Sequence, residues 1–205
     1  DEDLARFRTG SITEFVIDLG PGYDAVLAGM HKIHRKNIRR AQRAELDIIE
    51  DSSLDGLLAL RAMQLASSER AGEKTEGFAV REEAYFRDIQ KHVYGPGLGT
   101  LLFTHLEGEP VAALAWLHAA DRVLTVRSGS LPAGYESRAM YLLHDELIRR
   151  AIDASAVELN IGGVPTEASE RGHAQAGLYE FKKGFGGTPM QRHGLEIPLA
   201  EVGRS

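Results

Sequence analysis

Two lysines and two phenylalanines stand together near the C-terminus, in the segment Phe181-Lys182-Lys183-Gly184-Phe185-Gly186. Transfer of an acyl group to an amine passes through a tetrahedral species with an oxyanion, and a fixed cation or N–H group beside that oxygen lowers the barrier. A lysine that aromatic neighbours hold near the edge of a sheet is suited to this chemistry. The alternative is a surface helix whose lysines are solvated and whose aromatic side chains pack in the core. Composition alone favours that alternative.

A second group consists of six cations on one predicted helix. Residues 25–44 contain no acidic residue, whereas the whole chain has 24 basic and 30 acidic residues and a net charge of −6. The cations are Lys32, Arg35, Lys36, Arg39, Arg40 and Arg43. Such a cluster on an acidic protein indicates an anionic partner at one place, and each phosphate that it neutralises adds salt-dependent affinity. The alternative is a solvated helix face, and the two interpretations stay open.

A third group is the pair Arg81 and Tyr85, which are spaced four residues apart and share one face of a helix predicted over 81–93. Arginine binds phosphate through bidentate hydrogen bonds. The alternative for this pair is the ordinary start of an amphipathic helix.

These segments, in this order, resemble the Fem family, the aminoacyltransferases that add amino acids to peptidoglycan precursors. Fem proteins carry a phenylalanine-lysine pair before a Phe-Gly, and Phe181 and Lys182 match it here. A hydrophobic strand that ends in Asn160-Ile-Gly-Gly-Val164 precedes the pair. The resemblance implies that Lys182 stabilises the oxyanion and that Phe181 positions the donor. The adjacent Lys183 is the alternative candidate for the role of Lys182.

The resemblance also implies partners. Fem proteins have a Lys/Arg-rich helix before their second GNAT-like domain, so the six cations would face aminoacyl-tRNA. Arg81 and Tyr85 correspond to a Fem arginine and tyrosine that help to hold the cell-wall precursor, and Lys183 is a further substrate-binding candidate. The implied function is transfer of an aminoacyl group from aminoacyl-tRNA to an amine, such as a peptidoglycan precursor, without a tightly bound cofactor.

The order of secondary-structure elements must bring these segments together. A strand over 13–19 and a helix over 24–45, capped by Asp24 and with Ile33 on its apolar face, form a predicted linking segment, 1–45. From residue 46 the predicted order is β-α-α-β-β-β-α-β-α-β. It matches the acetyltransferase-like fold called GNAT, an α/β fold with a mixed, mostly antiparallel sheet flanked by helices. In this domain, 46–205, we predict strands over 46–50, 100–106, 111–118, 122–128, 157–161 and 190–199, and helices over 52–71, 81–93, 138–154 and 178–185. Ser137 is the predicted cap of the helix over 138–154, and residues 72–77 form a predicted polar loop.

Composition and motifs exclude several classes of site. The absence of cysteine excludes disulfides, thiolate metal sites and a cysteine nucleophile, and it fits a cytoplasmic protein. No apolar run approaches the roughly 20 residues that span a bilayer. His31 and His34 lie among cations, and the acidic neighbours of His144 face other directions on their helix, so no metal site is predicted.

Two alternatives accompany the Fem-like function. The first is a CoA-dependent N-acyltransferase of the GNAT superfamily. Such enzymes hold the CoA pyrophosphate on backbone N–H groups of a glycine-rich loop before the long helix, whereas residues 131–139 have one glycine, Gly134, and the acidic Glu136. The second alternative is a GNAT-like module that binds a partner without catalysis. Because Fem proteins usually have two GNAT-like halves, we expect either a missing N-terminal half or a homodimer.

Overall fold

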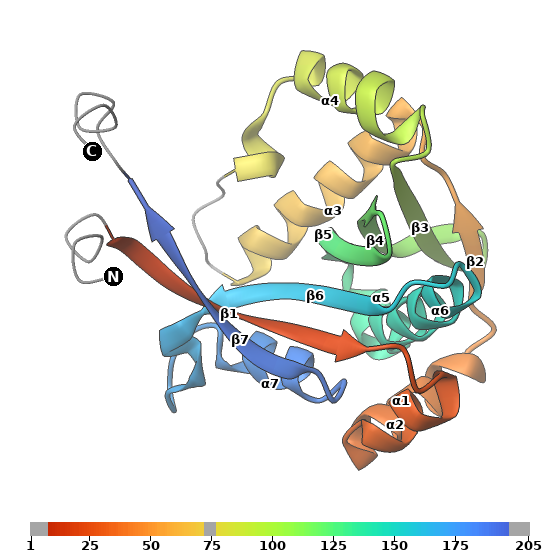
Figure 1. Ribbon diagram of the computed structural model, residues 1–205. Helices are drawn as coiled ribbons and strands as arrows, with labels where there is room; N and C mark the ends of the chain where they lie inside the picture. Colours follow the sequence, from red (N-terminus) through yellow and green to blue (C-terminus); the bar gives the residue numbers. More distant parts are fainter. Residues whose placement is uncertain (1–7, 72–76, 197–205) are drawn as a thin grey trace.

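The computed structural model describes residues 8–71 and 77–196. Within them, seven strands form one sheet in the order β2-β3-β4-β5-β6-β1-β7, in which only the β5–β6 pair is parallel (Figure 1). This sheet, with helices packed on it, confirms the predicted GNAT-like α/β fold. In chain order the elements are β1 (Arg8–Asp18), α1 (Tyr23–Gly29), α2 (Lys32–Gln42), β2 (Asp47–Glu50), α3 (Leu54–Ala71), the 3-10 helix η2 (Gly77–Val80), α4 (Glu83–Ile89), the π-helical turn η3 (Gln90–Tyr94), β3 (Gly99–Leu106), β4 (Glu109–Ala119), β5 (Arg122–Ser130), α5 (Pro132–Glu136), α6 (Ala139–Asp153), β6 (Glu158–Pro165), the 3-10 helix η4 (Thr166–Ser169), α7 (Ala176–Lys183) and β7 (Thr188–Leu195).

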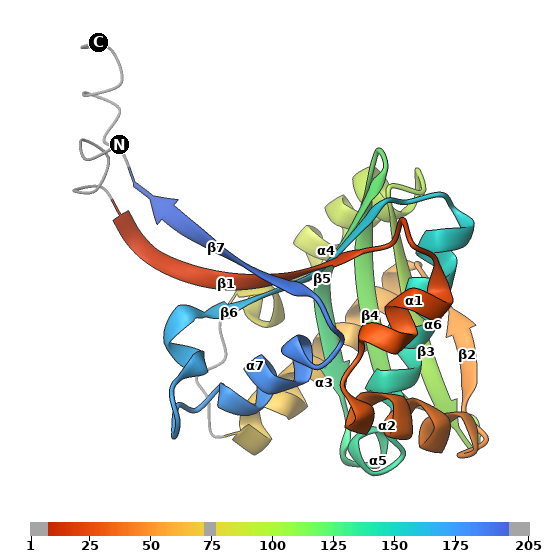
Figure 2. The ribbon, with the colours of Figure 1, turned by 60° about the horizontal axis from the view of Figure 1, so that its bottom comes forward.

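Two hydrophobic cores lie on the two faces of the sheet. Helices α1, α2 and α6 cover one face, and α3 and α4 cover the other (Figures 1 and 2). The alternation of strand side chains supplies both cores. Leu102 and Leu114 join the core that contains Phe185, whereas Leu101 and Phe103 join the core that contains residues of α3.

Strands β5 and β6 pair only briefly and then separate. Their parallel pairing joins Arg122–Leu124 to Glu158–Asn160, although both strands continue beyond these residues. Figure 2 shows β6 running with β1 and β7 away from β5 after this point. The sheet therefore opens between Thr125 and Ile161, and α7 lies beside the opening.

The single helix predicted over 24–45 is instead two helices, α1 and α2, which join at Met30 and His31. Met30 has an extended backbone, and the Nδ1 atom of His31 accepts a hydrogen bond from the Ile33 N–H at the start of α2. Ile33, which the helical pattern places on the apolar face, is 52% exposed. The break turns His34 inward in its place.

Two predicted helix caps are wrong. Gly22, and not Asp24, precedes α1, and no side chain caps this helix. Ser137 turns its hydroxyl back to the Ala133 carbonyl of α5, a short helix that the sequence analysis does not predict. Arg138 occupies the N-cap position of α6 with a left-handed backbone (φ 64°).

The remaining differences concern boundaries. The helix predicted over 81–93 is α4 followed by η3, so Arg81 precedes the helix. The predicted loop over 72–77 lies outside the described residues except for Gly77, and so does the predicted strand after residue 196.

Residues before 46 take part in the same sheet and core as the residues that follow. Strand β1 lies between β6 and β7, and α2 packs against α6. The predicted linking segment thus supplies an inner strand next to the opening of the sheet.

Candidate active site

A cavity of about 430 Å³ lies where β5 and β6 diverge. Its walls come from strands β1, β4, β5 and β6 and from helices α3, α6 and α7. Its polar side chains are Glu14, Gln64, Thr125, Arg127, Ser128, His144 and Lys182. Groups that are far apart in the sequence therefore meet at the opening of the sheet. We call this space the lysine cavity.

Lys182 reaches from the last turn of α7 into the lysine cavity. Its Nζ atom donates a hydrogen bond to the Gly163 carbonyl of β6 at 3.1 Å. Gly162 leaves room for the ammonium, because a Cβ atom there would lie 2.9 Å from Lys182 Nζ, and its φ of +76° also favours glycine. Burial lowers the pKa of Lys182 to about 8, against the opposing effect of the Glu14 carboxylate. A lysine with this pKa is still mostly cationic at neutral pH.

Glu14, on β1, is a site residue that the sequence analysis missed. Its carboxylate accepts hydrogen bonds from Asn160 Nδ2 at 2.9 Å and from Arg192 Nε at 3.2 Å. The Oδ1 atom of Asn160 in turn accepts from the Gly162 N–H at 2.8 Å, which fixes the backbone beside the lysine. A carboxylate near the start of a predicted apolar strand was the available signal. Strands β1, β6 and β7 are thus tied together around one fixed negative charge.

Phe181 packs within a group of aromatic rings. Its ring centroid lies between 5.1 and 5.9 Å from those of His34, Tyr141, His144 and Phe185. Ring contacts of this kind favour offset and edge-to-face geometry and hold the side chain in one orientation.

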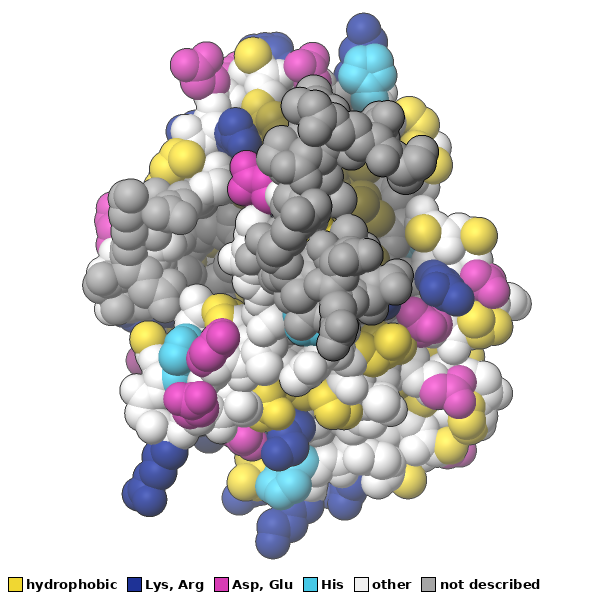
Figure 3. Space-filling view, turned by 60° about the vertical axis from the view of Figure 1, so that its left-hand side comes forward, with side chains coloured by type: hydrophobic (Ala, Val, Ile, Leu, Met, Phe, Trp, Pro, Cys, Tyr) yellow, Lys and Arg dark blue, Asp and Glu magenta, His cyan; other side chains and the backbone are white. Residues whose placement is uncertain are grey.

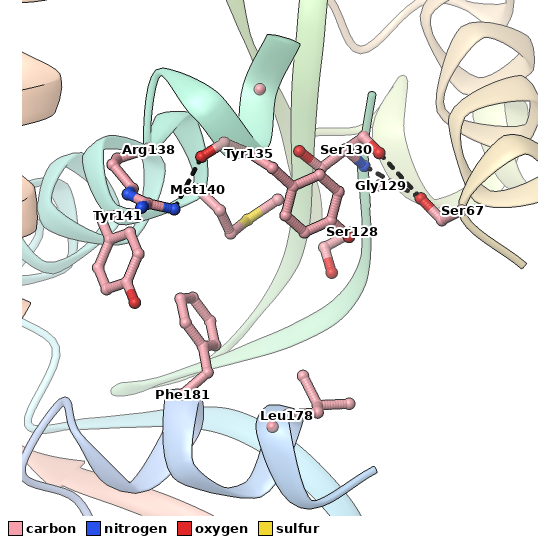
Figure 4. Close-up of a pocket in the computed structure, with 12 residues that line it drawn as sticks. Ser67, Ser128, Gly129, Ser130, Tyr135, Arg138, Met140, Tyr141, Leu178 and Phe181 are labelled. Atoms are coloured by element: carbon pink, nitrogen blue, oxygen red, sulfur yellow. Dashed lines mark hydrogen bonds between the residues drawn. The ribbon is translucent and has the colours of Figure 1, made fainter. Parts of the chain in front are cut away.

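A second cavity, of about 420 Å³, adjoins the lysine cavity along Leu178 and Phe181, which line both. Figure 4 shows these two side chains pointing from α7 toward the wall that carries Met140 and Tyr141. The polar side chains of this second cavity are Ser67, Ser128, Ser130, Tyr135, Arg138 and Tyr141. Phe181 therefore stands at the boundary between two spaces with different polar groups.

Arg138 gives the second cavity a positive end. Its Nη1 atom donates to the Tyr135 carbonyl at 3.0 Å, while its buried Nε atom has no hydrogen-bond partner among the described residues. It lies at the N-terminus of the 15-residue helix α6, where the helix dipole also favours negative charge.

His144, on α6, is a second site residue that the sequence analysis missed. Its Nδ1 atom lies 2.9 Å from the Met140 carbonyl; since a carbonyl only accepts, Nδ1 carries the proton and Nε2 is the unprotonated nitrogen. The imidazole stacks on Phe185 with a centroid distance of 4.8 Å. Burial lowers the pKa of His144 to about 4, so the side chain is neutral at physiological pH. The signal for its burial was its helical spacing with Met140, Leu147 and Ala151.

Lys183 points away from the lysine cavity. Its side chain is 58% exposed, and its Nζ atom lies 3.9 Å from a Glu180 carboxylate oxygen. It lines a third cavity, of about 570 Å³, together with His31 and His34. Of the two neighbouring lysines, Lys182 is the one in the opening of the sheet.

Arg81 and Tyr85 lie together on the surface but outside the two adjoining cavities as the described residues define them. The Arg81 guanidinium stands 5.6 Å from the centre of the Tyr85 ring. Tyr85 packs edge-on against Phe78, and Arg127 of the lysine cavity stands over the same Phe78 ring at 5.4 Å. One aromatic ring thus separates the pair from the cavity wall.

The predicted basic stripe lies on α2 and just beyond it, with one exception. The exposed cations are Lys32, Lys36, Arg39, Arg40 and Arg43. Arg35 instead is half-buried and donates hydrogen bonds to the carbonyls of Ala28 and Met30 at the end of α1. In Figure 3, Lys and Arg side chains gather at the lower end of the view, the end where α2 lies in Figure 1.

Among residues 8–71 and 77–196, no group of three or more His, Cys, Asp or Glu side chains is placed to hold a metal ion. None of the helices in these ranges combines the length and the apolar character needed to cross a membrane.

Several solved structures share this fold. The crystal structure of FemX matches with a TM-score of 0.73 at 13% identity, over 87% of this chain and 59% of FemX. The C-terminal domain of a putative lysylphosphatidylglycerol synthetase from Agrobacterium fabrum matches with a TM-score of 0.63 at 16% identity, over 91% of this chain and 59% of that one. A protein from Clostridium acetobutylicum, described as a predicted acetyltransferase with acetyl-CoA, matches with a TM-score of 0.50 at 11% identity, over 76% and 97% of the two chains. At such identities the likeness shows the fold, and this chain spans less than two thirds of the first two proteins.

No curated protein sequence matches the chain. The sequence model of a family described as the acetyltransferase (GNAT) domain matches residues 30–183, which is more than half of the chain and includes every element from α2 to α7. The chain therefore belongs to the family of acetyltransferase (GNAT) domains.

Proposed function

We propose that this acyltransferase domain moves an aminoacyl group from aminoacyl-tRNA to an amine and so forms a peptide bond. The observation that carries the proposal is the place of Lys182, a largely buried cation fixed at the opening of a GNAT sheet. Likeness to the folds of FemX and of a putative lysylphosphatidylglycerol synthetase supports an aminoacyl donor.

In the proposed reaction, the acceptor amine attacks the ester carbonyl carbon of the donor. A C–N bond forms, the C–O bond to the ribose breaks, and the proton of the amine passes to the released ribose oxygen directly or through water. The ammonium of Lys182 donates a hydrogen bond to the oxyanion of the tetrahedral species. Its hydrogen bond to the Gly163 carbonyl orients it before substrate arrives.

Phe181 borders both adjoining cavities, and we assign to it the positioning of the donor carbonyl. The second cavity suits the terminal nucleotide of the donor, because Arg138 attracts phosphate and Tyr135 offers a ring for a base. The lysine cavity suits the acceptor, because the Glu14 carboxylate attracts its ammonium group, which loses one proton to water before the neutral amine attacks.

The remaining candidates are assigned to binding. The five exposed cations of the α2 stripe contact tRNA phosphates. Arg81 and Tyr85 contact an acceptor that is long enough to pass Arg127 and Phe78, and an anionic group on it would meet the Arg81 guanidinium. Lys183 offers a further contact at the third cavity.

Transfer from acyl-CoA is a second candidate function. The family match to an acetyltransferase domain and the likeness to a fold described with acetyl-CoA favour it. In that case the second cavity receives the CoA, and Arg138 replaces part of the missing glycine-rich loop. A non-catalytic module that binds an anionic partner is the remaining alternative.

A parallel transfer assay separates these functions. Labelled aminoacyl-tRNA and labelled acetyl-CoA are each offered to the purified chain with a panel of amine acceptors. Label that moves from tRNA supports the proposal, and label that moves only from acetyl-CoA favours the second candidate. If neither label moves to any acceptor while labelled tRNA still binds, the binding module is favoured.

Replacement of the lysine tests the mechanism. Lys182→Ala is expected to lower kcat about 100-fold or more with little change in KM, since loss of one oxyanion donor costs roughly 10²–10³ in rate. Lys91→Ala, at an exposed lysine on η3, is the matched control and is expected to keep full turnover. Full turnover by Lys182→Ala contradicts the mechanism.

A further inference from the structure

A buried histidine joins the basic helix α2 to the helix that carries Lys182. His34 is 6% exposed, and its Nε2 atom lies 2.7 Å from the carbonyl oxygen of Phe181. Because a carbonyl only accepts hydrogen bonds, Nε2 is the protonated nitrogen and donates to it. The other ring nitrogen, Nδ1, is buried and has no partner among the described residues. The hydrogen bond to Phe181 is therefore the polar contact that orients this ring.

The space for the imidazole exists because residue 184 is glycine. A Cβ atom at Gly184 would lie 1.9 Å from the Cε1 atom of His34, so any larger residue would displace the ring. A backbone hydrogen bond also joins these two segments, since the His31 N–H donates to the Gly184 carbonyl at 2.9 Å. A Cβ atom at Gly186 would lie 2.7 Å from the Gly29 carbonyl oxygen. The α1–α2 junction and the end of α7 thus interlock through glycines.

Aromatic contacts hold the imidazole from its other sides. The His34 ring meets the edges of Tyr141 and Phe185, with centroid distances of 5.0 and 4.8 Å. It also lies 5.9 Å from the ring of Phe181. One side chain of α2 therefore contacts both the backbone and the ring of the residue that directly precedes Lys182.

We propose that His34 is a positioning residue of the transferase, which holds the Phe181 carbonyl and thereby sets the place of the Lys182 ammonium in the lysine cavity. The inference rests on the proposed function in so far as Lys182 is the reacting cation. It also gives the cation-bearing helix α2 a direct mechanical connection to the reacting centre.

The alternative is that His34 only fills space in the core. Two substitutions distinguish this structural role from the positioning role. His34→Phe keeps an aromatic ring and removes the donor, whereas His34→Gln replaces the ring and keeps an N–H near the position of Nε2. A core-filling role predicts that Phe is the better replacement. A positioning role predicts that Gln is better, because it restores the bond to the Phe181 carbonyl.

The first readout needs no substrate. In protein labelled with ¹³C-lysine, the resonance of Lys182, identified by its loss in Lys182→Ala, reports the titration of that amine. We expect a midpoint near 8 in the wild type and in His34→Gln, and a shift of His34→Phe toward 10.5, because a loosened α7 admits water to the amine. His105→Gln is the matched control, since His105, on β3 and away from the site, makes the same kind of bond to the Gly108 carbonyl in the following turn (3.1 Å).

The second readout is turnover with the donor that the parallel assay identifies. We expect kcat of His34→Phe to fall at least tenfold with KM within about twofold, and His34→Gln to recover most of it. Should His34→Phe not fold, Gly184→Ala displaces the ring from the opposite side and is expected to give the same shift and the same loss.

The two readouts keep the inference separate from the function that it rests on. If no label moves from tRNA, the proposed function is wrong, and if Lys182→Ala retains turnover, the assigned role of Lys182 is wrong; in both cases the lysine resonance still reports whether His34 positions this side chain. If Lys182→Ala is inactive while His34→Phe and Gly184→Ala keep wild-type kcat and the wild-type midpoint, the positioning role of His34 is overturned.

Discussion

In the proposed mechanism, Lys182 has to remain cationic in a site that removes it from water. Burial lowers its pKa to about 8, and the Glu14 carboxylate raises it; His144 and Arg127 line the same cavity. The cationic form is present below this pKa and is lost as the pH rises through it. We therefore expect kcat to fall on the alkaline side with a midpoint near 8, measured from pH 6.5 to 9.5 with saturating substrates.

Removal of the opposing charge tests the cause of that alkaline limb. Glu14→Gln is expected to move the midpoint to lower pH, because a neutral amide no longer favours the ammonium. A midpoint that stays in place or rises in this variant would show that another group controls the limb.

The residues of the site differ in how well they can be predicted from their sequence context. Phe181 and Lys182 lie in a segment that resembles a family motif, so they are predictable as a pair. His34 is hidden because its neighbours in the sequence are cations, and its partner, the Phe181 carbonyl, is a backbone group 147 residues away. Glu14 and His144 are predictable only as exceptions to an apolar pattern, and that pattern does not say what they face.

Among the helices, α2 combines two tasks that the cations on it do not share equally. Arg35 donates to the carbonyls of Ala28 and Met30, which the end of α1 otherwise leaves without intrahelical partners. We expect Arg35→Ala to lower the free energy of unfolding by about 1–2 kcal/mol, measured by urea denaturation. Lys36→Ala, at an exposed position, is expected to change it by less than ~0.5 kcal/mol.

Binding of tRNA is expected to respond in the opposite way. If Lys36 contacts a tRNA phosphate as proposed, Lys36→Ala lowers the slope of log affinity against log salt by about one, whereas Arg35→Ala leaves the slope unchanged. Equal effects of both variants on the slope would place Arg35 on the tRNA surface as well.

The order and type of the strands and longer helices follow from the sequence, because hydrophobic alternation and turn residues are local. The break between α1 and α2 does not, since the helical pattern continues through Met30 and the junction is fixed by Gly184 and Gly186 of a distant segment. Helix α5 and the left-handed backbone of Arg138 are missed for a similar reason. They depend on the fit of Gly134 against the Val111 carbonyl of β4, and a Cβ atom at Gly134 would lie 2.4 Å from that oxygen.

At the scale of the whole molecule, the site lies where strands β5 and β6 separate, in a sheet that has a hydrophobic core on each face. The opening can exist because β6 keeps β1 as its partner after it leaves β5, and β1 in turn pairs with β7. The chain spans 59% of FemX, so completion of the acceptor site by a further half or by a second copy stays a prediction. The molecular mass of the purified chain in solution, with and without acceptor, tests the second of these.

The stability of the whole molecule should depend on pH through its buried histidines. Burial lowers the pKa of His144 from 6.5 to about 4, and it lowers that of His34 as well. Between pH 6.5 and about pH 4, His144 of the unfolded chain binds a proton that His144 of the folded chain does not. The contribution of His144 to the free energy of unfolding is therefore fully present above pH 6.5 and is lost as the pH decreases. For His144, the lowering of the pKa from 6.5 to about 4 corresponds to about 3 kcal/mol.

This dependence is measurable as the free energy of unfolding in urea at pH 7 and at pH 4.5, for the wild type and for His144→Phe. The variant keeps an aromatic ring against Phe185 and has no group to protonate, so its stability should fall less over this interval. Carboxylates and the other histidines contribute equally to the pH dependence of both proteins, so their contributions cancel when the two are compared. His92→Gln, at an exposed histidine, should fall in parallel with the wild type. If His144→Phe also falls in parallel, His144 binds its proton as readily in the folded chain as in the unfolded one. In that case α6 does not hold this imidazole away from water, and the wall of the lysine cavity is more open than its geometry indicates.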